Sequence, residues 1–162
     1  MIFTSGSNGK PKCALLSAYN VLTASFESMR SQKLTDEDRT CLILPLFHIF
    51  GLVAGFFANL LAGSTLYFPT EIHTDDIIAT IGRYRCTVFH AVPTMMLMLL
   101  NKESFEAEKL SSIRCTILSG AAATPLQIER FHKTLPYNAS KYPFSFSIWL
   151  KRSGSDLHAA LR

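Results

Sequence analysis

A short segment near the N-terminus, rich in glycine and small hydroxyl residues, has the composition of a phosphate-binding loop. Residues 4–12 read Thr-Ser-Gly-Ser-Asn-Gly-Lys-Pro-Lys and lie between two short apolar runs. Glycines and small side chains let the backbone approach an anion and turn several N–H groups toward it, while lysine adds positive charge. The segment is not a Walker loop, because Pro11 stands where that motif has serine or threonine. The same residues also fit a hairpin with a type I′ turn at Asn8-Gly9, so both interpretations stay open.

Three further groups of residues could contact a ligand at the ends of predicted strands. His48 follows an apolar run, and its imidazole could bond a ligand oxygen or could be a core histidine that caps the preceding loop. His90 ends another apolar run, at the carboxyl ends of strands where α/β sheets bind ligands. Gly120, Ala121 and Ala122 leave room for a flat ring, and they equally suit a strand-to-helix turn. At each position the residue types are compatible with both roles.

Hydrophobic periodicity predicts an α/β fold whose elements place these residues at strand ends. Short β-branched or apolar runs alternate with longer helical patterns, which is typical of strand-helix-strand units and a parallel sheet. The predicted strands are residues 12–16, 40–44, 64–68, 86–90 and 114–119. The predicted helices are residues 17–32, 47–61, 74–84, 94–101 and 125–135, the last beginning with a capping box at Thr124. We expect three layers, with a mostly parallel sheet between flanking helices.

The composition restricts the class of protein. The chain has 162 residues, of which 48% are hydrophobic and 17% charged, so it can bury a core and is not intrinsically disordered. Its net charge of +4 raises the question of a nucleic-acid or anionic-lipid partner. However, residues 1–138 carry 12 basic and 11 acidic residues, whereas residues 139–162 carry four and one, so the basic charge lies mainly in the tail. We therefore expect no nucleic-acid partner.

Targeting signals and cysteine usage predict a cytoplasmic protein. The four cysteines stand far apart without a C-x-x-C pair, which is typical of reduced thiols in a core rather than of a metal site. The N-terminus has neither the charged region nor the long apolar stretch of a secretory signal. Residues 42–62 form an apolar stretch, but Pro45, His48 and Asn59 interrupt it. We expect a buried helix there and no transmembrane span.

Three blocks in register resemble the signatures of the adenylate-forming (AMP-binding) enzymes, which include the acyl-CoA synthetases. Residues 4–12 resemble the T-S-G-[ST]-T-G-x-P-K motif of this superfamily. Residues 44–51, Leu-Pro-Leu-Phe-His-Ile-Phe-Gly, are similar to its P-x-F-H-x-x-G segment, and residues 118–122, Leu-Ser-Gly-Ala-Ala, resemble its S-G-[GA]-A block. The resemblance extends from residue 2 to about residue 138 and implies a piece of the family's large domain.

The resemblance implies a ligase that uses ATP with Mg²⁺ to activate a small-molecule carboxylic acid as an acyl-adenylate and then transfers the acyl group to a thiol such as coenzyme A. It also implies the roles of particular residues. The ATP phosphates would be contacted by Thr4, Ser5, Gly6, Ser7, Asn8, Gly9 and Lys12. His48 would contact the acyl substrate or the adenylate, and Gly120, Ala121 and Ala122 would line the adenine and acyl pocket. Asn8 departs from the usual threonine: it keeps a hydrogen-bond donor and loses the hydroxyl group.

Several motifs of the resembled family do not occur in this sequence. They are the Tyr-Gly-x-Thr-Glu and Thr-Gly-Asp segments and the C-terminal domain with its catalytic lysine. We expect residues 1–138 to be a partial AMP-binding domain and residues 139–162 to be an unrelated tail, with a strand-like alternation at residues 144–148. Such a truncated chain should be inactive alone and should self-associate through exposed apolar surface. The alternative is a non-catalytic nucleotide-binding or interaction module, or half of a split enzyme.

Overall fold

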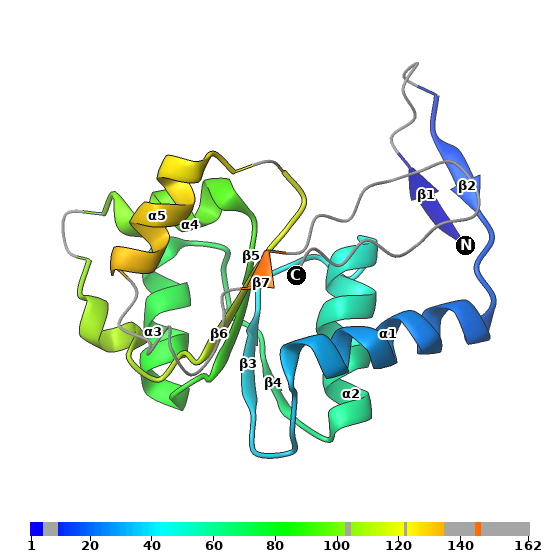
Figure 1. Cartoon of the computed structure of the whole chain (residues 1–162), viewed down its shortest axis with the longest axis horizontal. Helices are drawn as coiled ribbons and strands as arrows, with labels where there is room; N and C mark the ends of the chain where they lie inside the picture. The colour runs from blue at the N-terminus through cyan, green and yellow to red at the C-terminus, as the bar shows by residue number, and fades with distance from the viewer. Residues whose placement is uncertain (5–9, 103–104, 122, 135–144, 147–162) are drawn as a thin grey trace.

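The computed structural model describes residues 1–4, 10–102, 105–121, 123–134 and 145–146 of the chain. It has the three-layered α/β architecture that the sequence predicts, with a parallel sheet between two layers of helices (Figure 1). In this described part of the chain, no helix combines the length and the apolar character needed to cross a membrane.

The central sheet has five parallel strands. In spatial order they are β4 (Thr65–Tyr67), β3 (Arg39–Leu42), β5 (Val88–Ala91), β6 (Cys115–Leu118) and β7 (Ser145–Phe146). The first four overlap the predicted strands and are shorter. The short β7 lies within the strand-like alternation predicted at residues 144–148 and pairs with β6 at the edge of the sheet.

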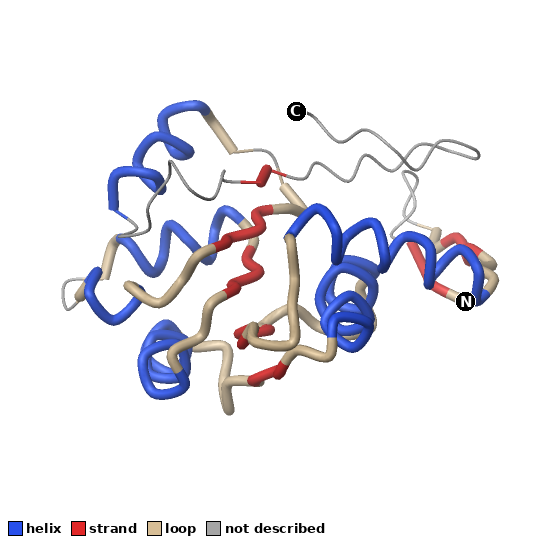
Figure 2. Tube along the Cα trace, turned by 60° about the horizontal axis from the view of Figure 1, so that its bottom comes forward, coloured by secondary structure: helices blue, strands red, loops and turns tan. Residues whose placement is uncertain are grey.

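A small antiparallel hairpin precedes this sheet. It consists of β1 (Ile2–Thr4) and β2 (Lys12–Ala14), with Thr4 paired with Lys12. Helix α1 (Ala18–Gln32) follows, and it begins with a capping box between Ser17 and Asn20. Figures 1 and 2 both show the hairpin beyond the N-terminal end of α1, apart from the five-stranded sheet.

Three of the remaining helices match predicted ones: α3 (Thr74–Tyr84), α4 (Pro93–Leu100) and α5 (Pro125–Thr134). The short 3₁₀ helix η2 (Ala107–Leu110) was not predicted. The helix predicted over residues 47–61 is instead a π-helix, η1 (Phe50–Phe57), which continues as α2 (Ala58–Ala62). A π-helix has wider turns, and Phe50, Ala54 and Ala58, spaced four residues apart, are buried against the sheet.

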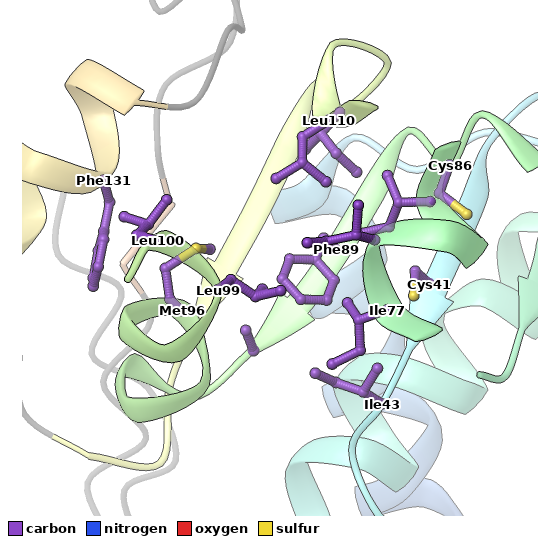
Figure 3. Close-up of a cluster of buried hydrophobic side chains, with 14 of the residues drawn as sticks. Cys41, Ile43, Ile77, Cys86, Phe89, Met96, Leu99, Leu100, Leu110 and Phe131 are labelled. Carbon is purple, nitrogen blue, oxygen red and sulfur yellow. The ribbon is translucent and has the colours of Figure 1, made fainter. Parts of the chain in front are cut away.

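Two hydrophobic clusters, one on each face of the sheet, hold the layers together. Because side chains alternate along a strand, Cys41 and Ile43 join the cluster beneath α3 and α4, while Leu42 and Leu44 join the cluster beneath α1 and η1. Figure 3 shows the first cluster, where the ring of Phe89 lies among side chains from neighbouring helices and strands.

Three of the four cysteines confirm the prediction of buried thiols. They are Cys41, Cys86 and Cys115. The prediction is wrong for Cys13, which is exposed on β2, because the hairpin that carries it stands apart from the sheet.

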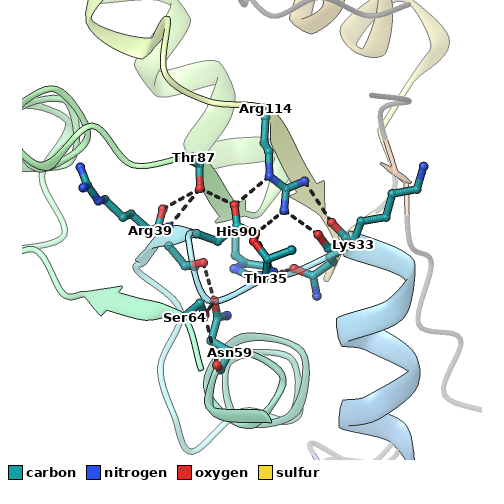
Figure 4. A network of polar contacts seen from close by, with 11 residues as sticks. Lys33, Thr35, Arg39, Asn59, Ser64, Thr87, His90 and Arg114 are labelled. Carbon is teal, nitrogen blue, oxygen red and sulfur yellow. Dashed lines mark hydrogen bonds and ion pairs between the residues drawn. The ribbon is translucent and has the colours of Figure 1, made fainter. Parts of the chain in front are cut away.

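An ion pair at the amino ends of the strands ties the layers together. Arg114, just before β6, donates from Nε to Oδ1 of Asp38 at 2.7 Å and from Nη2 to the carbonyl oxygen of Lys33 at 2.9 Å, which satisfies the C-terminal end of α1 (Figure 4). The hydroxyl of Thr87 donates to the same carboxylate at 2.7 Å. Burial alone would raise the pKa of Asp38, but the hydrogen bonds from Arg114, Thr87 and the Thr35 N–H outweigh it and lower that pKa.

Candidate functional site

The loops that follow three adjacent strands form the candidate site. His48 lies in the loop after β3, Val92 directly follows β5, and Gly120 follows β6. The order of these strands in the sheet is β3-β5-β6, and all are parallel, so the three loops leave the same edge. The carboxyl edge of a parallel sheet is where α/β folds bind ligands. The structure thus brings together two of the three predicted groups of site residues.

His48 lies in a turn that leads into η1. Its backbone N–H donates to the carbonyl oxygen of Pro45 at 3.1 Å, and its Nδ1 accepts from the backbone N–H of Phe50 at 3.2 Å. The side chain is exposed, so it is not a core histidine, and it caps the start of the following helix rather than the preceding loop. Since Nδ1 accepts a hydrogen bond, the neutral ring carries its proton on Nε2, which can serve as a donor to a ligand.

Gly51 allows this turn to form, a role that the sequence reasoning missed. A Cβ atom on Gly51 would lie 2.5 Å from the carbonyl oxygen of Pro45 and 3.0 Å from that of Leu44. Both neighbours are backbone atoms, so a side chain here would force the loop away from the helix. One signal in the sequence could have indicated this role. Gly51 lies inside a helical pattern, where a glycine often has a packing reason such as a close approach of another backbone segment.

Gly120 has a backbone conformation suited to glycine. Its φ is +89°, in the region that L side chains rarely adopt, and an added Cβ would lie 3.2 Å from Cγ1 of Val92. Gly120 and Ala121 are both exposed, whereas Ser119 before them is buried. Ala122 lies outside the described residues. Gly120 thus forms a turn and also borders open surface. The structure is compatible with both interpretations of this block, a strand-to-helix turn and room for a flat ring.

The phosphate-loop candidate lies on the separate hairpin. Thr4 and Lys12 close the hairpin on opposite strands, and the Lys12 side chain is exposed. Ser5, Gly6, Ser7, Asn8 and Gly9 lie outside the described residues, so their role as a cradle stays a prediction. The strand predicted after the loop is confirmed as β2, and β1 precedes the loop.

His90 does not open onto the carboxyl edge. It is fully buried, its Nε2 lies 2.8 Å from Oε1 of Gln32, and the ring of Phe50 stands edge-on to it at 5.8 Å between centroids. Burial disfavours the charged imidazole and lowers the pKa of His90 to about 4. The apolar run predicted His90 at the end of a strand. Nothing in the helical pattern of residues 17–32 predicted that its last residue, Gln32, is buried and contacts His90.

The chain belongs to the AMP-binding enzyme family, because the family model for "AMP-binding enzyme" matches residues 1–141. Among curated relatives, the acyl-CoA ligase sidI of Aspergillus fumigatus is 34% identical over 147 residues, which are 90% of this chain and 25% of that protein. The chain spans about a quarter of the length of the curated relatives that it matches.

Solved structures agree with this assignment. The ATP-bound structure of MatB from Rhodopseudomonas palustris has a TM-score of 0.77 over 85% of this chain and 28% of that chain, at 24% identity, and so supports the fold alone. The O-succinylbenzoate coenzyme A synthetase MenE of Bacillus subtilis, solved with ATP and magnesium ion, has a TM-score of 0.71 at 29% identity over 90% of this chain and 29% of that chain.

Proposed function

We propose that this chain supplies the phosphate-binding loop and part of the acyl and adenine site of an ATP-dependent acid–thiol ligase. In the first step a carboxylate oxygen attacks the α-phosphorus of ATP, and pyrophosphate leaves. In the second, the sulfur of a thiol such as coenzyme A attacks the acyl carbonyl carbon, AMP leaves and the thiol proton is released. The observation that carries the proposal is the joint position of His48 and Gly120 at the carboxyl edge in a member of the AMP-binding family.

The hairpin residues would bind the triphosphate. Backbone N–H groups of residues 5–9 would surround the β and γ phosphates, and the exposed ammonium group of Lys12 would neutralise part of their charge. Phosphoryl-centre substitution depends mainly on position and on charge neutralisation, so this loop would act by holding the leaving pyrophosphate.

The carboxyl-edge residues would contact the reacting carboxylate and the adenine. His48 Nε2–H is a donor on an exposed ring, suited to an oxygen of the carboxylate or of the adenylate phosphate. Gly120 suits a site that a flat ring enters. A Cβ atom at this position would lie close to Val92 and would reduce the space left for the ring. We assign no residue of this chain to the selection of the acyl group or to the binding of the thiol acceptor.

Magnesium and coenzyme A belong to the proposed reaction without assigned protein ligands. Across the residues that the structure describes, no group of three or more His, Cys, Asp and Glu side chains gathers in a way that could hold a metal ion. The acyl-CoA ligase names of relatives such as sidI support coenzyme A as the acceptor.

Nucleotide binding tests the proposal directly. We expect the full chain to bind Mg-ATP weakly in isothermal titration calorimetry, and Lys12→Ala to weaken binding about fivefold, the worth of one ordinary polar contact of about 1 kcal/mol. Lys133→Ala is the matched control, because Lys133 is exposed on α5 and paired with Glu129 at 2.6 Å. Equal affinity of both variants, or no binding by the parent chain, would contradict the proposed phosphate loop.

The catalytic part of the proposal has its own test. We expect no ATP–pyrophosphate exchange by the chain alone with a panel of carboxylic acids. Exchange above a no-enzyme control would show that the chain is active by itself and would overturn the expectation of an inactive piece.

An interaction role receives support from the unusual surface of α1. Its exposed face carries Tyr19, Leu22 and Phe26, whereas its buried face carries Ser25 and Ser28. Exposed apolar residues at positions i, i+3 and i+7 form a continuous stripe that favours a second polypeptide. We propose self-association or assembly with a further part of the enzyme in the cytoplasm, which light scattering after size-exclusion chromatography would detect as a mass above that of one chain.

A further inference from the structure

The buried amide of Gln32 connects three elements beneath the carboxyl-edge site. Gln32 is the last residue of α1 and is only 3% exposed. Its Nε2 donates to Oγ of Ser28 at 2.8 Å and to the carbonyl oxygen of Ala54 in η1 at 3.1 Å. Its Oε1 lies 2.8 Å from Nε2 of His90 on β5. One side chain thus links α1, η1 and β5.

These contacts determine the orientation of the amide and the tautomer of His90. The carbonyl oxygen of Ala54 can only accept, so the NH₂ group of Gln32 must face it. Oε1 of Gln32 then faces His90, which must donate to it from Nε2–H. Nδ1 of His90 has no hydrogen-bond partner among the described residues, in keeping with a neutral ring held from one side.

Phe50 contacts both His90 and His48. Its ring lies edge-on to the imidazole of His90 at an interplanar angle of 85°, and the residue is only 3% exposed. Its backbone N–H donates to Nδ1 of His48. A shift of Phe50 would therefore remove the acceptor role of Nδ1 and, with it, the preference of His48 for the Nε2–H tautomer.

We propose that Gln32 and His90 form a buried positioning pair that, through Phe50, holds His48 with Nε2–H directed to the candidate site. The pair touches no substrate and acts only through the first turn of η1. The inference rests on the proposed function in one respect, which is the assignment of His48 as the residue that contacts the acyl substrate or the adenylate.

The tautomer of His48 is the readout that tests the pair. A sample of the full chain with ¹⁵N-labelled histidine gives a ring pattern for each of its five histidines in a long-range ¹H–¹⁵N correlation spectrum. His48→Asn and His90→Gln identify two of them by loss of signal. We expect both His48 and His90 to carry the proton on Nε2. A His90 ring protonated on Nδ1 in the parent chain would overturn the proposal without any variant.

Variants then test whether the pair acts on His48. In Gln32→Leu and in His90→Phe we expect the ratio of the two His48 tautomers to shift about fivefold toward Nδ1–H, the equivalent of losing one hydrogen bond. Thr40→Val is the control: it removes a buried hydrogen bond to Asn59, which lies beyond the far end of η1 from His48, and should leave the His48 pattern unchanged.

Two outcomes of the variant series would overturn the proposal. One is an unchanged His48 pattern in both Gln32→Leu and His90→Phe, and the other is an equal change in Thr40→Val, which would mean that any loss of stability moves His48. The spectra are recorded without nucleotide. Failure to bind ATP would therefore count against the proposed function and leave the positioning pair intact, while unchanged spectra with normal ATP binding would do the reverse.

Discussion

Acidification should begin to destabilise this fold near pH 6.5, above the pH at which most carboxylates titrate, because His90 is buried. The ring is fully buried, and burial lowers its pKa from 6.5 to about 4. Between these values the unfolded chain binds a proton that the folded chain does not bind. The free energy of unfolding therefore falls as the pH falls from about 6.5 to about 4. At about 1.4 kcal/mol for each pH unit, the loss amounts to about 3 kcal/mol.

Urea unfolding followed by far-UV circular dichroism at pH 7.5, 6.5, 5.5 and 4.5 measures this loss. His90→Gln removes the titration and keeps a donor for Oε1 of Gln32, so its stability should change less over the same range. The difference in slope between the two proteins should approach about 1.4 kcal/mol per pH unit below pH 6. His73→Gln is the control, because the His73 side chain is 76% exposed.

A parallel loss of stability by the parent chain and His90→Gln between pH 6.5 and 4.5 would contradict this prediction. Parallel curves would mean that His90 is solvated in the native state or that the histidine is already charged there. A curve for His73→Gln as shallow as that of His90→Gln would also contradict the assignment of the slope to the buried ring.

Two further substitutions test other parts of the structure by urea unfolding. Arg114→Met should cost about 3 kcal/mol, because it leaves the carboxylate of Asp38, whose side chain is 4% exposed, without its ionic partner; a loss below about 1 kcal/mol would contradict this. Gly51→Ala should lower the free energy of unfolding by about 2 kcal/mol, because the added Cβ would lie 2.5 Å from the carbonyl oxygen of Pro45. Gly82→Ala is the control: its Cβ would make an ordinary 3.8 Å contact, so the substitution should be neutral or stabilising by up to about 1 kcal/mol. Equal effects of the two substitutions would exclude the steric explanation.

Local signals predicted the elements well where one physical rule dominated. The capping box at Thr124 is present, with the Thr124 N–H donating to Oε1 of Gln127 at 2.8 Å, and α5 begins at Pro125 as predicted. The helix predicted over residues 74–84 has the same bounds in the structure, with His73 as its N-cap. Alternation of apolar runs and helical patterns was enough to predict a parallel sheet.

Local sequence patterns could not predict features that depend on contacts between residues far apart in the chain. The π-helical form of residues 50–57 depends on how Phe50 and Ala54 pack against the sheet, which periodicity over a short window does not resolve from an α-helix. The burial of His90 depends on Gln32, 58 positions earlier in the chain. The position of His48 and Gly120 at one edge could be predicted, since it follows from strand direction alone.

The Asp38–Arg114 ion pair and the candidate site occupy opposite ends of the same strands. The ion pair of Asp38 and Arg114 lies at the amino ends, and His48 and Gly120 lie beyond the carboxyl ends, about 13 Å away for strands of four residues. Substitutions at the two ends should combine additively where they share no partner, which excludes Arg114, because its Nη1 donates to the carbonyl oxygen of Gln32 at 3.2 Å. Variation of the carboxyl-edge loops should therefore start from a scaffold first reinforced at amino-edge positions that do not contact Gln32, since stability gained there is retained when the loops change.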